Sequence, residues 1–292
     1  MSSFWKFARY AVRIVILVYV GTQVYMLIAV QGRFAKHLPV SVAGGEAVTT
    51  GTEGHRIAGR VYVSGPPSAS APLVVILHGD SPFHLPSYQY LLAQSVANAV
   101  PGTRVAGLLR PGYGDPYGAK SDGPRGFASG ENYTQLITDD LAAAIQQLKE
   151  RWNASSVILV GHSGGATLTA DIAATHPGLV QHAVLVSCPC DVAAFRSHMW
   201  RLQHSVLWLL PAHSLSPLKT LDRMSGDLSI TAVTGSVDPI ALPEYTYDYV
   251  AKAKARGNPA ETVVLPGLGH EILNEPATVE QVVKAVRSAQ KM

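Results

Sequence analysis

The segment Val157-Ile158-Leu159-Val160-Gly161-His162-Ser163-Gly164-Gly165 decides the fold class of this chain. Its four aliphatic residues predict a buried strand, and the run that follows them predicts a helix. A strand that turns directly into a helix within G-x-S-x-G holds the serine in a strained backbone conformation with its hydroxyl projecting. Only minimal side chains then fit two positions before and after the serine. Gly161 and Gly165 meet that demand. We therefore predict an exposed reactive serine at Ser163, and an ordinary glycine turn is the alternative.

A serine hydroxyl is a weak nucleophile at its ordinary pKa, so it needs a base, and the base needs a carboxylate that fixes its tautomer. His270 ends the loop Leu265-Pro266-Gly267-Leu268-Gly269-His270, which follows the last predicted strand, and Asp238 follows the strand before it. Asp191, at the end of an earlier strand, is the other candidate acid. We predict that Ser163, Asp238 and His270 are nucleophile, acid and base, a chain order unlike that of chymotrypsin or subtilisin.

The chain alternates short β-branched runs with segments of helical period, which is typical of a mostly parallel sheet covered by helices on both faces. Two apolar stripes carry the helical signal: Ile137, Leu141, Ala144, Ile145, Leu148 and Trp152 in one, and Val279, Val282, Val283 and Val286 in the other. The predicted strands are Arg60–Val63, Leu73–Leu77, Val105–Leu109, Val157–Val160, Ala183–Val186, Ile230–Thr234 and Thr262–Leu265.

With these segments in place, the chain resembles the α/β-hydrolase superfamily over nearly everything after residue 55. His78-Gly79-Asp80 looks like the oxyanion loop of that family, and Arg110-Pro111-Gly112-Tyr113-Gly114 is similar to a turn seen in many members. The resemblance implies an α/β-hydrolase fold. It also implies that the backbone N–H groups of Asp80 and Gly164 form the oxyanion hole, where two donors stabilise the charge that develops on the substrate oxygen.

The resemblance further implies a serine hydrolase that cleaves an ester or similar acyl bond of a small-molecule acyl substrate. A serine at the turn argues against the dehalogenase and epoxide hydrolase branches, which use a carboxylate there. An aminopeptidase-like amide hydrolase is the alternative, and an inactive membrane-tethered binding or scaffold protein is a third possibility. The sequence holds no P-loop, no dinucleotide-binding glycine motif and no metal constellation, so we expect no cofactor and no metal.

Several further residues are candidates for the neighbourhood of the substrate. We expect His78 to organise its loop and His162, which adjoins the nucleophile, to pack behind it. Three more histidines have spacings that match no common zinc pattern: His198, His204 and His213. The substrate-pocket candidates are His78, Tyr113, His162, Cys188 and Trp200.

Residues 191–226 interrupt the alternation with bulky apolar side chains, and we predict that they form a short lid over the carboxyl ends of the strands. An ordinary crossover helix with a long loop is the alternative. Just before this segment lies Cys188-Pro189-Cys190. A disulfide between cysteines two residues apart would be strained, so we predict reduced thiols that pack under the lid, with a redox-sensitive role as the alternative.

The N-terminal segment carries a charge-free stretch from Ile14 to Gly32, long enough to cross about 30 Å of hydrocarbon as a helix. We predict an uncleaved single-pass membrane anchor. A cleaved signal peptide and a buried core helix are the alternatives. Lys6, Arg9 and Arg13 precede the stretch, against Arg33 and Lys36 after it. This excess favours a cytoplasmic N-terminus and a catalytic domain in the periplasm or outside the cell.

We predict three regions in the chain: an anchor with its flanks at 1–37, a linker and first-strand region at 38–54, and a catalytic domain at 55–292 that contains the lid.

The composition excludes several classes of protein. With 47% hydrophobic and 15% charged residues, the 292-residue chain is neither disordered nor fibrous, and two cysteines are too few to stabilise a fold built on disulfides. Five of its 23 basic residues and none of its 20 acidic residues lie in residues 1–45. The body is therefore near neutral, and we expect no nucleic-acid partner. Protein partners are not indicated.

Overall fold

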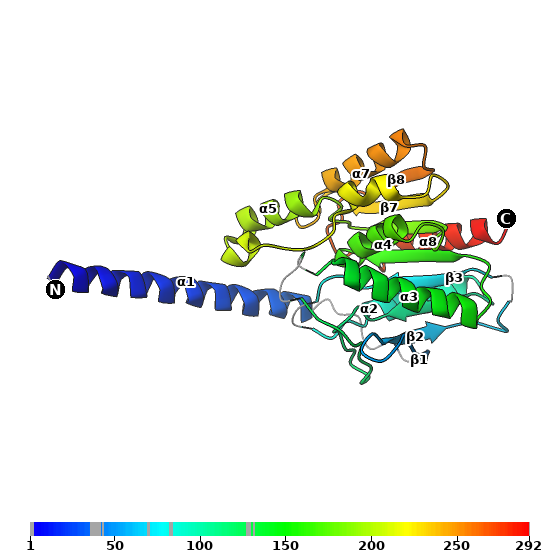
Figure 1. The fold of residues 1–292 in the computed structure, drawn as a ribbon, viewed down its shortest axis with the longest axis horizontal. Helices are drawn as coiled ribbons and strands as arrows, with labels where there is room; N and C mark the ends of the chain where they lie inside the picture. Colours follow the sequence, from blue (N-terminus) through cyan, green and yellow to red (C-terminus); the bar gives the residue numbers. More distant parts are fainter. Residues whose placement is uncertain are drawn as a thin grey trace. The chain divides into compact units, whose positions relative to one another are not determined.

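The computed structural model describes residues 3–35, 42, 44–68, 71–81, 84–126, 130 and 132–291 of the chain (Figure 1). The chain divides into two compact units, Met1–Val40 and Ser41–Met292. The first contains the single helix α1, Ser3–Ala35. Its stretch Trp5–Tyr25 is long and apolar enough to cross a membrane, a test that a signal sequence near the N-terminus also passes. α1 is therefore a candidate span, while retention of the anchor and its orientation stay predictions.

The second unit is built on an eight-stranded sheet in the order β1-β2-β4-β3-β5-β6-β7-β8. β1 pairs antiparallel with β2 and β2 with β4, and all later neighbours are parallel. This confirms the predicted mostly parallel sheet. The strands are β1 Glu46–Thr50, β2 Ile57–Tyr62, β3 Leu73–Leu77, β4 Arg104–Leu108, β5 Val157–His162, β6 His182–Val186, β7 Ser229–Gly235 and β8 Ala260–Leu265.

Helices cover both faces of the sheet because the central strands are apolar on both sides. In β5, Val157 and Leu159 join the core that contains α3 and α4, while Ile158 and Val160 join the core that contains α2 and α8. The helices of the second unit are α2 Tyr88–Ala99, α3 Gln135–Arg151, α4 Gly164–Thr175, α5 Val192–Gln203, α6 Pro217–Thr220, α7 Pro243–Ala255 and α8 Pro276–Ala289, with 3₁₀ turns η1 Val206–Leu209 and η2 Leu221–Arg223.

The first predicted helical stripe lies on α3, except for Trp152, which caps the end of that helix, and the second stripe lies on α8. α3 begins where the Thr134 side chain accepts a hydrogen bond from the Ile137 N–H, and its buried face includes Leu141, Ile145 and Leu148. In α8, Val282 and Val286 are fully buried against the other face of the sheet. Apolar burial at helical spacing therefore fixes the orientation of both helices.

The parallel strands bring their carboxyl ends to one edge of the sheet. Ser163 follows β5, Asp238 follows β7 and His270 follows β8, although they lie far apart in the sequence. Residues 191–226 leave the sheet between β6 and β7 and form α5, η1, α6 and η2. That this segment opens and closes as a lid stays a prediction.

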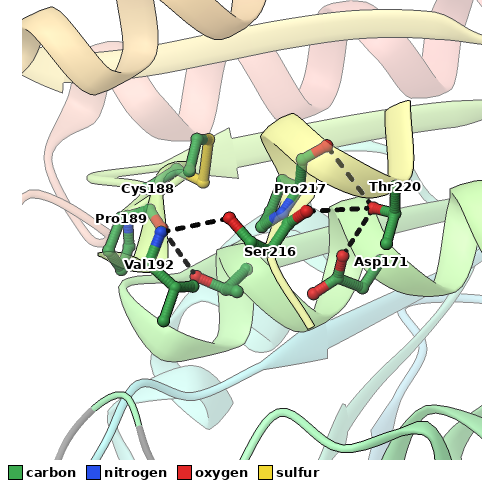
Figure 2. The surroundings of a disulfide bond; sticks show 9 residues. Asp171, Cys188, Pro189, Val192, Ser216, Pro217 and Thr220 are labelled. Carbon is green, nitrogen blue, oxygen red and sulfur yellow. Dashed lines mark hydrogen bonds between the residues drawn. A yellow bond between two sulfur atoms is a disulfide. The ribbon is translucent and has the colours of Figure 1, made fainter. Parts of the chain in front are cut away.

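α6 is fastened to the helix that follows Ser163 through a buried carboxyl group (Figure 2). The Thr220 hydroxyl donates a 2.7 Å hydrogen bond to Asp171 of α4. Burial raises the pKa of Asp171 from its ordinary 3.8 to about 8, against the lowering effect of that hydrogen bond. Asp171 is therefore largely neutral in the folded protein at pH 7, whereas it is ionised in the unfolded chain.

This difference predicts a pH-dependent stability. Between pH 4 and pH 8 the folded state keeps a proton that the unfolded state has released, so stability falls as pH rises, by up to about 1.4 kcal/mol per pH unit. We expect Asp171→Asn, which does not titrate, to lack this slope. Urea unfolding at pH 5 and pH 8 should show the parent losing stability relative to the variant. Asp248→Asn, at an exposed position of α7, is the matched control, and a slope equal in Asp171→Asn and parent would contradict the prediction.

Candidate active site

The turn between β5 and α4 places Ser163 in a backbone conformation that side chains rarely adopt, with φ +53° and ψ −122°. A Cβ atom on Gly161 would lie 2.2 Å from the Gly165 carbonyl oxygen, and one on Gly165 would lie 2.5 Å from the Leu77 carbonyl oxygen. Neither position tolerates a larger residue. The steric demand inferred from the sequence is thus present in the structure, since the backbone segments around Ser163 are in direct contact.

The structure brings Ser163, His270 and Asp238 together in one hydrogen-bonded line. The Nε2 atom of His270 lies 2.9 Å from the Ser163 hydroxyl, and its Nδ1 lies 2.8 Å from Oδ2 of Asp238. Oδ1 of Asp238 accepts hydrogen bonds from the N–H groups of Ile240 and Ala241, at 2.8 and 3.0 Å. The backbone thereby aims Oδ2 at the imidazole.

The competing acid, Asp191, is occupied elsewhere. Its side chain caps α5 by accepting hydrogen bonds from the N–H groups of Ala193 and Ala194. Of the two candidate carboxylates, Asp238 is therefore the one that contacts His270.

The protonation of His270 is set by opposing effects. Burial lowers the pKa of the imidazole, but the hydrogen bond and the charge of Asp238 outweigh burial, with a further contribution from the charge of Glu271. The pKa of His270 is raised above 6.5 as a result. Such an imidazole readily accepts a proton from a neighbouring hydroxyl.

A second set of hydrogen bonds holds the loop of His270 in place. The His270 carbonyl oxygen accepts bonds from the Ser187 hydroxyl at 2.9 Å and from Nε2 of His162 at 3.0 Å. Burial lowers the pKa of His162, so its ring is neutral and its Nδ1 accepts from the Tyr88 hydroxyl at 3.0 Å. That hydroxyl accepts in turn from the Gly79 N–H at 2.5 Å. The loop carrying His270 is therefore tied to the loop after β3.

The two predicted oxyanion residues are neighbours in the structure. A Cβ atom on Gly79 would lie 3.0 Å from Cβ of Ser163, so the loop 78–80 adjoins the serine. A Cβ atom on Gly164 would lie 2.5 Å from the Asp80 carboxylate. The Asp80 side chain therefore lies against the backbone of Gly164, while the role of the two N–H groups as oxyanion donors stays a prediction.

The Asp80 carboxylate is paired with an arginine and with hydrogen-bond donors inside the protein. It accepts hydrogen bonds from Nη1 of Arg110 at 2.7 Å, from the Tyr133 hydroxyl at 2.5 Å and from the Gly130 N–H at 3.0 Å. The side chains of Arg110 and Asp80 are only 2% and 9% exposed. Burial opposes the charge of Arg110, but Asp80 outweighs it and raises the pKa of the guanidinium. A buried ion pair thus supports the loop next to Ser163.

Comparison with known proteins identifies the family. Residues 69–230, more than half of the chain, match the family described as serine aminopeptidase, S33. The chain belongs to this family. The S33 match includes Ser163 and Asp80 but ends before Asp238 and His270, so the candidacy of these two residues rests on the geometry described above. No curated protein sequence matches the chain.

Solved structures share the fold of this S33 chain at low sequence identity. An esterase of Pyrococcus furiosus is 16% identical with a TM-score of 0.63, and the match covers 86% of this chain and 99% of that one. A hyperthermophilic esterase of Pyrobaculum calidifontis is 18% identical with a TM-score of 0.61, covering 87% and 85%. The proline iminopeptidase of Mycobacterium smegmatis is 14% identical with a TM-score of 0.59, covering 84% and 99%. Together with the family match, they show an enzyme of the α/β-hydrolase type.

The pocket candidates of the S33 chain lie at different depths. His78 and His162 are buried, as is Tyr113, and the His78 ring bonds to the Gly79 carbonyl and accepts from the Arg110 N–H. Trp200 is half-buried on α5, where it lines a hollow of about 440 Å³ beside η1 and α6. In the structure the buried rings of His78 and His162 hold the loops around Ser163, and contact of the pocket candidates with substrate stays a prediction.

The prediction of reduced thiols is wrong. Cys188 and Cys190 form a disulfide, and both side chains are fully buried (Figure 2). The bridge is possible because the chain bends at Pro189 and brings the two Cα atoms to 5.1 Å, inside the range that disulfides span. The bend is held by neighbouring bonds, since the Leu218 N–H donates to the Cys190 carbonyl and the Thr167 hydroxyl to the Pro189 carbonyl.

One group of side chains in the described part of this S33 chain has the proximity needed for a metal ion, namely His162, His270 and Glu271. The ring nitrogens of His270 already bond to Ser163 and Asp238, and those of His162 to Tyr88 and the His270 carbonyl. A metal would have to displace these bonds. The group is therefore better suited to proton transfer than to metal binding.

Proposed function

We propose that this enzyme is a serine hydrolase that cleaves an ester or similar acyl bond through an acyl-enzyme on Ser163. The observation that carries the proposal is the unbroken line from Asp238 through His270 to the Ser163 hydroxyl, at 2.8 and 2.9 Å. His270 takes the serine proton as the oxygen attacks the carbonyl carbon, and then delivers it to the leaving group. Water deacylates the enzyme by the same route. The oxyanion that forms would be stabilised by the N–H groups of Asp80 and Gly164.

Covalent labelling tests this proposal. The full chain in detergent is incubated with a fluorophosphonate probe, and the modified peptide is identified by mass spectrometry. We expect one label, on Ser163, and no labelling of Ser163→Ala or His270→Ala. Absence of labelling in a folded parent would favour the inactive scaffold protein instead. A label on another serine would refute the assignment of the nucleophile.

An aminopeptidase-like activity on the same three residues is a second candidate, and Glu271 is the observation that favours it. Its carboxylate is exposed and lies within 4.8 Å of ring nitrogens of His270 and His162, where it could hold the ammonium group of a substrate. The acids at the two ends of the lid are engaged: Asp191 caps α5, and Asp222 pairs with Arg256 at 3.1 Å. Steady-state comparison of an acyl ester with an aminoacyl amide separates the two. Glu271→Gln should raise KM for the amide alone if that carboxylate binds the ammonium.

The raised pKa of His270 predicts the pH dependence. Because the base must be neutral, kcat/KM should fall as the pH is lowered through the pKa of His270, which lies above 6.5. The charge of Glu271 contributes to the raised pKa of His270. Removing it should shift the acid limb of the pH profile, the range in which kcat/KM falls, to lower pH by less than about one unit. Ester hydrolysis by Glu271→Gln measures the shift. Glu280→Gln, at an exposed position of α8, should leave the limb in place, and an unmoved limb in Glu271→Gln would contradict the prediction.

A further inference from the structure

A run of exposed aliphatic side chains begins in the last turn of α5 and continues past its end. We call residues 202–210 the lid ridge. Its aliphatic members are each 48% to 61% exposed: Leu202, Val206, Leu207, Leu209 and Leu210. Among the other described residues of the second unit, exposed large apolar side chains occur singly along the chain. Scattered exposed apolar residues are normal, whereas a cluster of this kind marks an interaction surface.

The lid ridge is held in shape from beneath. The Trp208 ring is buried against Phe195, with centroids 5.7 Å apart and nearly perpendicular planes, and its N–H donates to Gln203 at 2.8 Å. With Trp208 turned inward, its neighbours Leu207 and Leu209 point outward. The exposed apolar surface therefore belongs to a packed element.

The backbone of the lid ridge is also supplied with internal hydrogen bonds. Nη2 of the buried Arg196 donates to the carbonyl oxygens of Leu207, Trp208 and Leu210, at 3.4, 3.1 and 2.6 Å. In water these carbonyls could bond to solvent at little cost. Beside hydrocarbon they could not, and a backbone carbonyl without a partner there costs several kcal/mol. An arginine under three carbonyls of one turn therefore suits a surface that enters a lipid interface.

Within residues 192–221, the segment that includes the lid ridge, the charged side chains all have one sign. The sequence between Asp191 and Asp222 holds Arg196, Arg201 and Lys219 and no acidic residue. Arg201 and Lys219 are exposed. A segment that combines exposed aliphatic side chains with exposed cations is typical of those that lie in the surface of an anionic membrane.

The same chain carries a candidate membrane span. α1 ends at Ala35 and β1 begins at Glu46. The ten residues between them can reach at most about 36 Å when fully extended. If α1 is retained in a bilayer, the second unit therefore stays close to lipid, and even weak docking would be favoured by the high local concentration.

We propose that the lid ridge docks into the interfacial layer of an anionic phospholipid bilayer. Leu207, Leu209 and their neighbours enter the headgroup and acyl boundary, Arg201 and Lys219 contact lipid phosphates, and Arg196 satisfies the carbonyls that leave water. The docking brings the segment between β6 and β7 to the lipid surface. It does not depend on the catalytic role of Ser163.

Site-specific fluorescence on the full chain tests the proposal. Both native cysteines are joined in a buried disulfide, so a cysteine introduced at Leu209 is the one thiol to label with an environment-sensitive dye. Leu136→Cys, at a 49% exposed leucine of α3, is the matched control. Both proteins are reconstituted in vesicles of phosphatidylcholine with phosphatidylglycerol, and quenching by aqueous iodide is measured. The two labelled proteins insert into the vesicles with the same mixture of orientations. The ratio of their iodide quenching therefore reports how far the label at position 209 is protected from water.

We expect the label at position 209 to be quenched at least about threefold less than the label at position 136 when anionic lipid is present. The protection should weaken in pure phosphatidylcholine and in high salt, where attraction to phosphates is screened. Equal quenching of the two labels in anionic vesicles would overturn the proposal. So would protection that follows the protein-to-lipid ratio rather than lipid charge, since that result would assign the lid ridge to a second copy of the chain.

Discussion

Ser163→Ala is expected to hydrolyse an acyl ester about 10⁶-fold more slowly than the parent, and His270→Ala to lose a similar amount. The reason is that the nucleophile and the base act as one unit. Without His270 the Ser163 proton has no acceptor, and without Ser163 the imidazole has no oxygen to activate. Their 2.9 Å contact and the burial of His270 support the proposal that both take part in the same proton transfer.

The double variant Ser163→Ala/His270→Ala makes this prediction specific. It should be no slower than either single variant, because the remaining rate comes from binding and the oxyanion donors alone. Steady-state ester hydrolysis with the full chain in detergent measures all three variants. Ser288→Ala, at an exposed position of α8, controls for the loss of a serine. Losses that multiply in the double variant would mean that Ser163 and His270 do not act in one step.

Much of the fold could be predicted from the sequence because its signals are local. Aliphatic runs such as Leu73–Leu77 and Val157–Val160 coincide with the observed β3 and the start of β5. β1, Glu46–Thr50, lies in the segment assigned only as a linker or first strand. Three of its five residues are polar, and its strand conformation comes from antiparallel pairing with β2.

The candidate triad was predictable for a similar reason, since each member directly follows a predicted strand. The residues that support the triad were not. Tyr88 and Ser187 act through contacts with partners 74 and 83 positions away in the chain, and no local pattern marks them. The left-handed backbone conformation of Ser187, with φ +49°, likewise cannot be predicted from its residue type.

The disulfide shows where a local rule fails. Cysteines two residues apart in an extended strand would lie more than about 6 Å apart at their Cα atoms, with less favourable geometry for a bridge. Here the strand β6 ends at Val186, and the chain turns through Pro189 before α5 begins. The spacing of 5.1 Å follows from that turn, which depends on the packing of α6 against it.

Arg110→Met is expected to lower the free energy of unfolding by about 3–5 kcal/mol, because it leaves the Asp80 carboxylate buried without its counter-charge. The negative charge of Asp80 would also remain beside Gly164, one of the expected oxyanion donors. There it would repel the negative charge that forms on the substrate oxygen. We therefore expect kcat/KM for an ester to fall together with stability. Tyr133 and the Gly130 N–H still bond to Asp80, but neither supplies a positive charge.

Replacing both partners distinguishes the charge effect from a loss of packing. Asp80→Asn/Arg110→Met removes the two charges together and should recover most of the stability that Arg110→Met loses, since a buried pair exchanged for neutral groups is often close to neutral in stability. Urea unfolding of the full chain in detergent measures the free energy of unfolding of the parent, of Arg110→Met and of the double variant. Arg56→Met is the matched control: Arg56 pairs with Asp122 at a similar 2.9 Å, but its side chain is 56% exposed, so its loss should cost far less stability than the loss of Arg110. If Arg110→Met cost no more than Arg56→Met, the buried pair would contribute no more than an ordinary surface contact, and the loop of Asp80 would be held by its hydrogen bonds to Tyr133 and Gly130 instead.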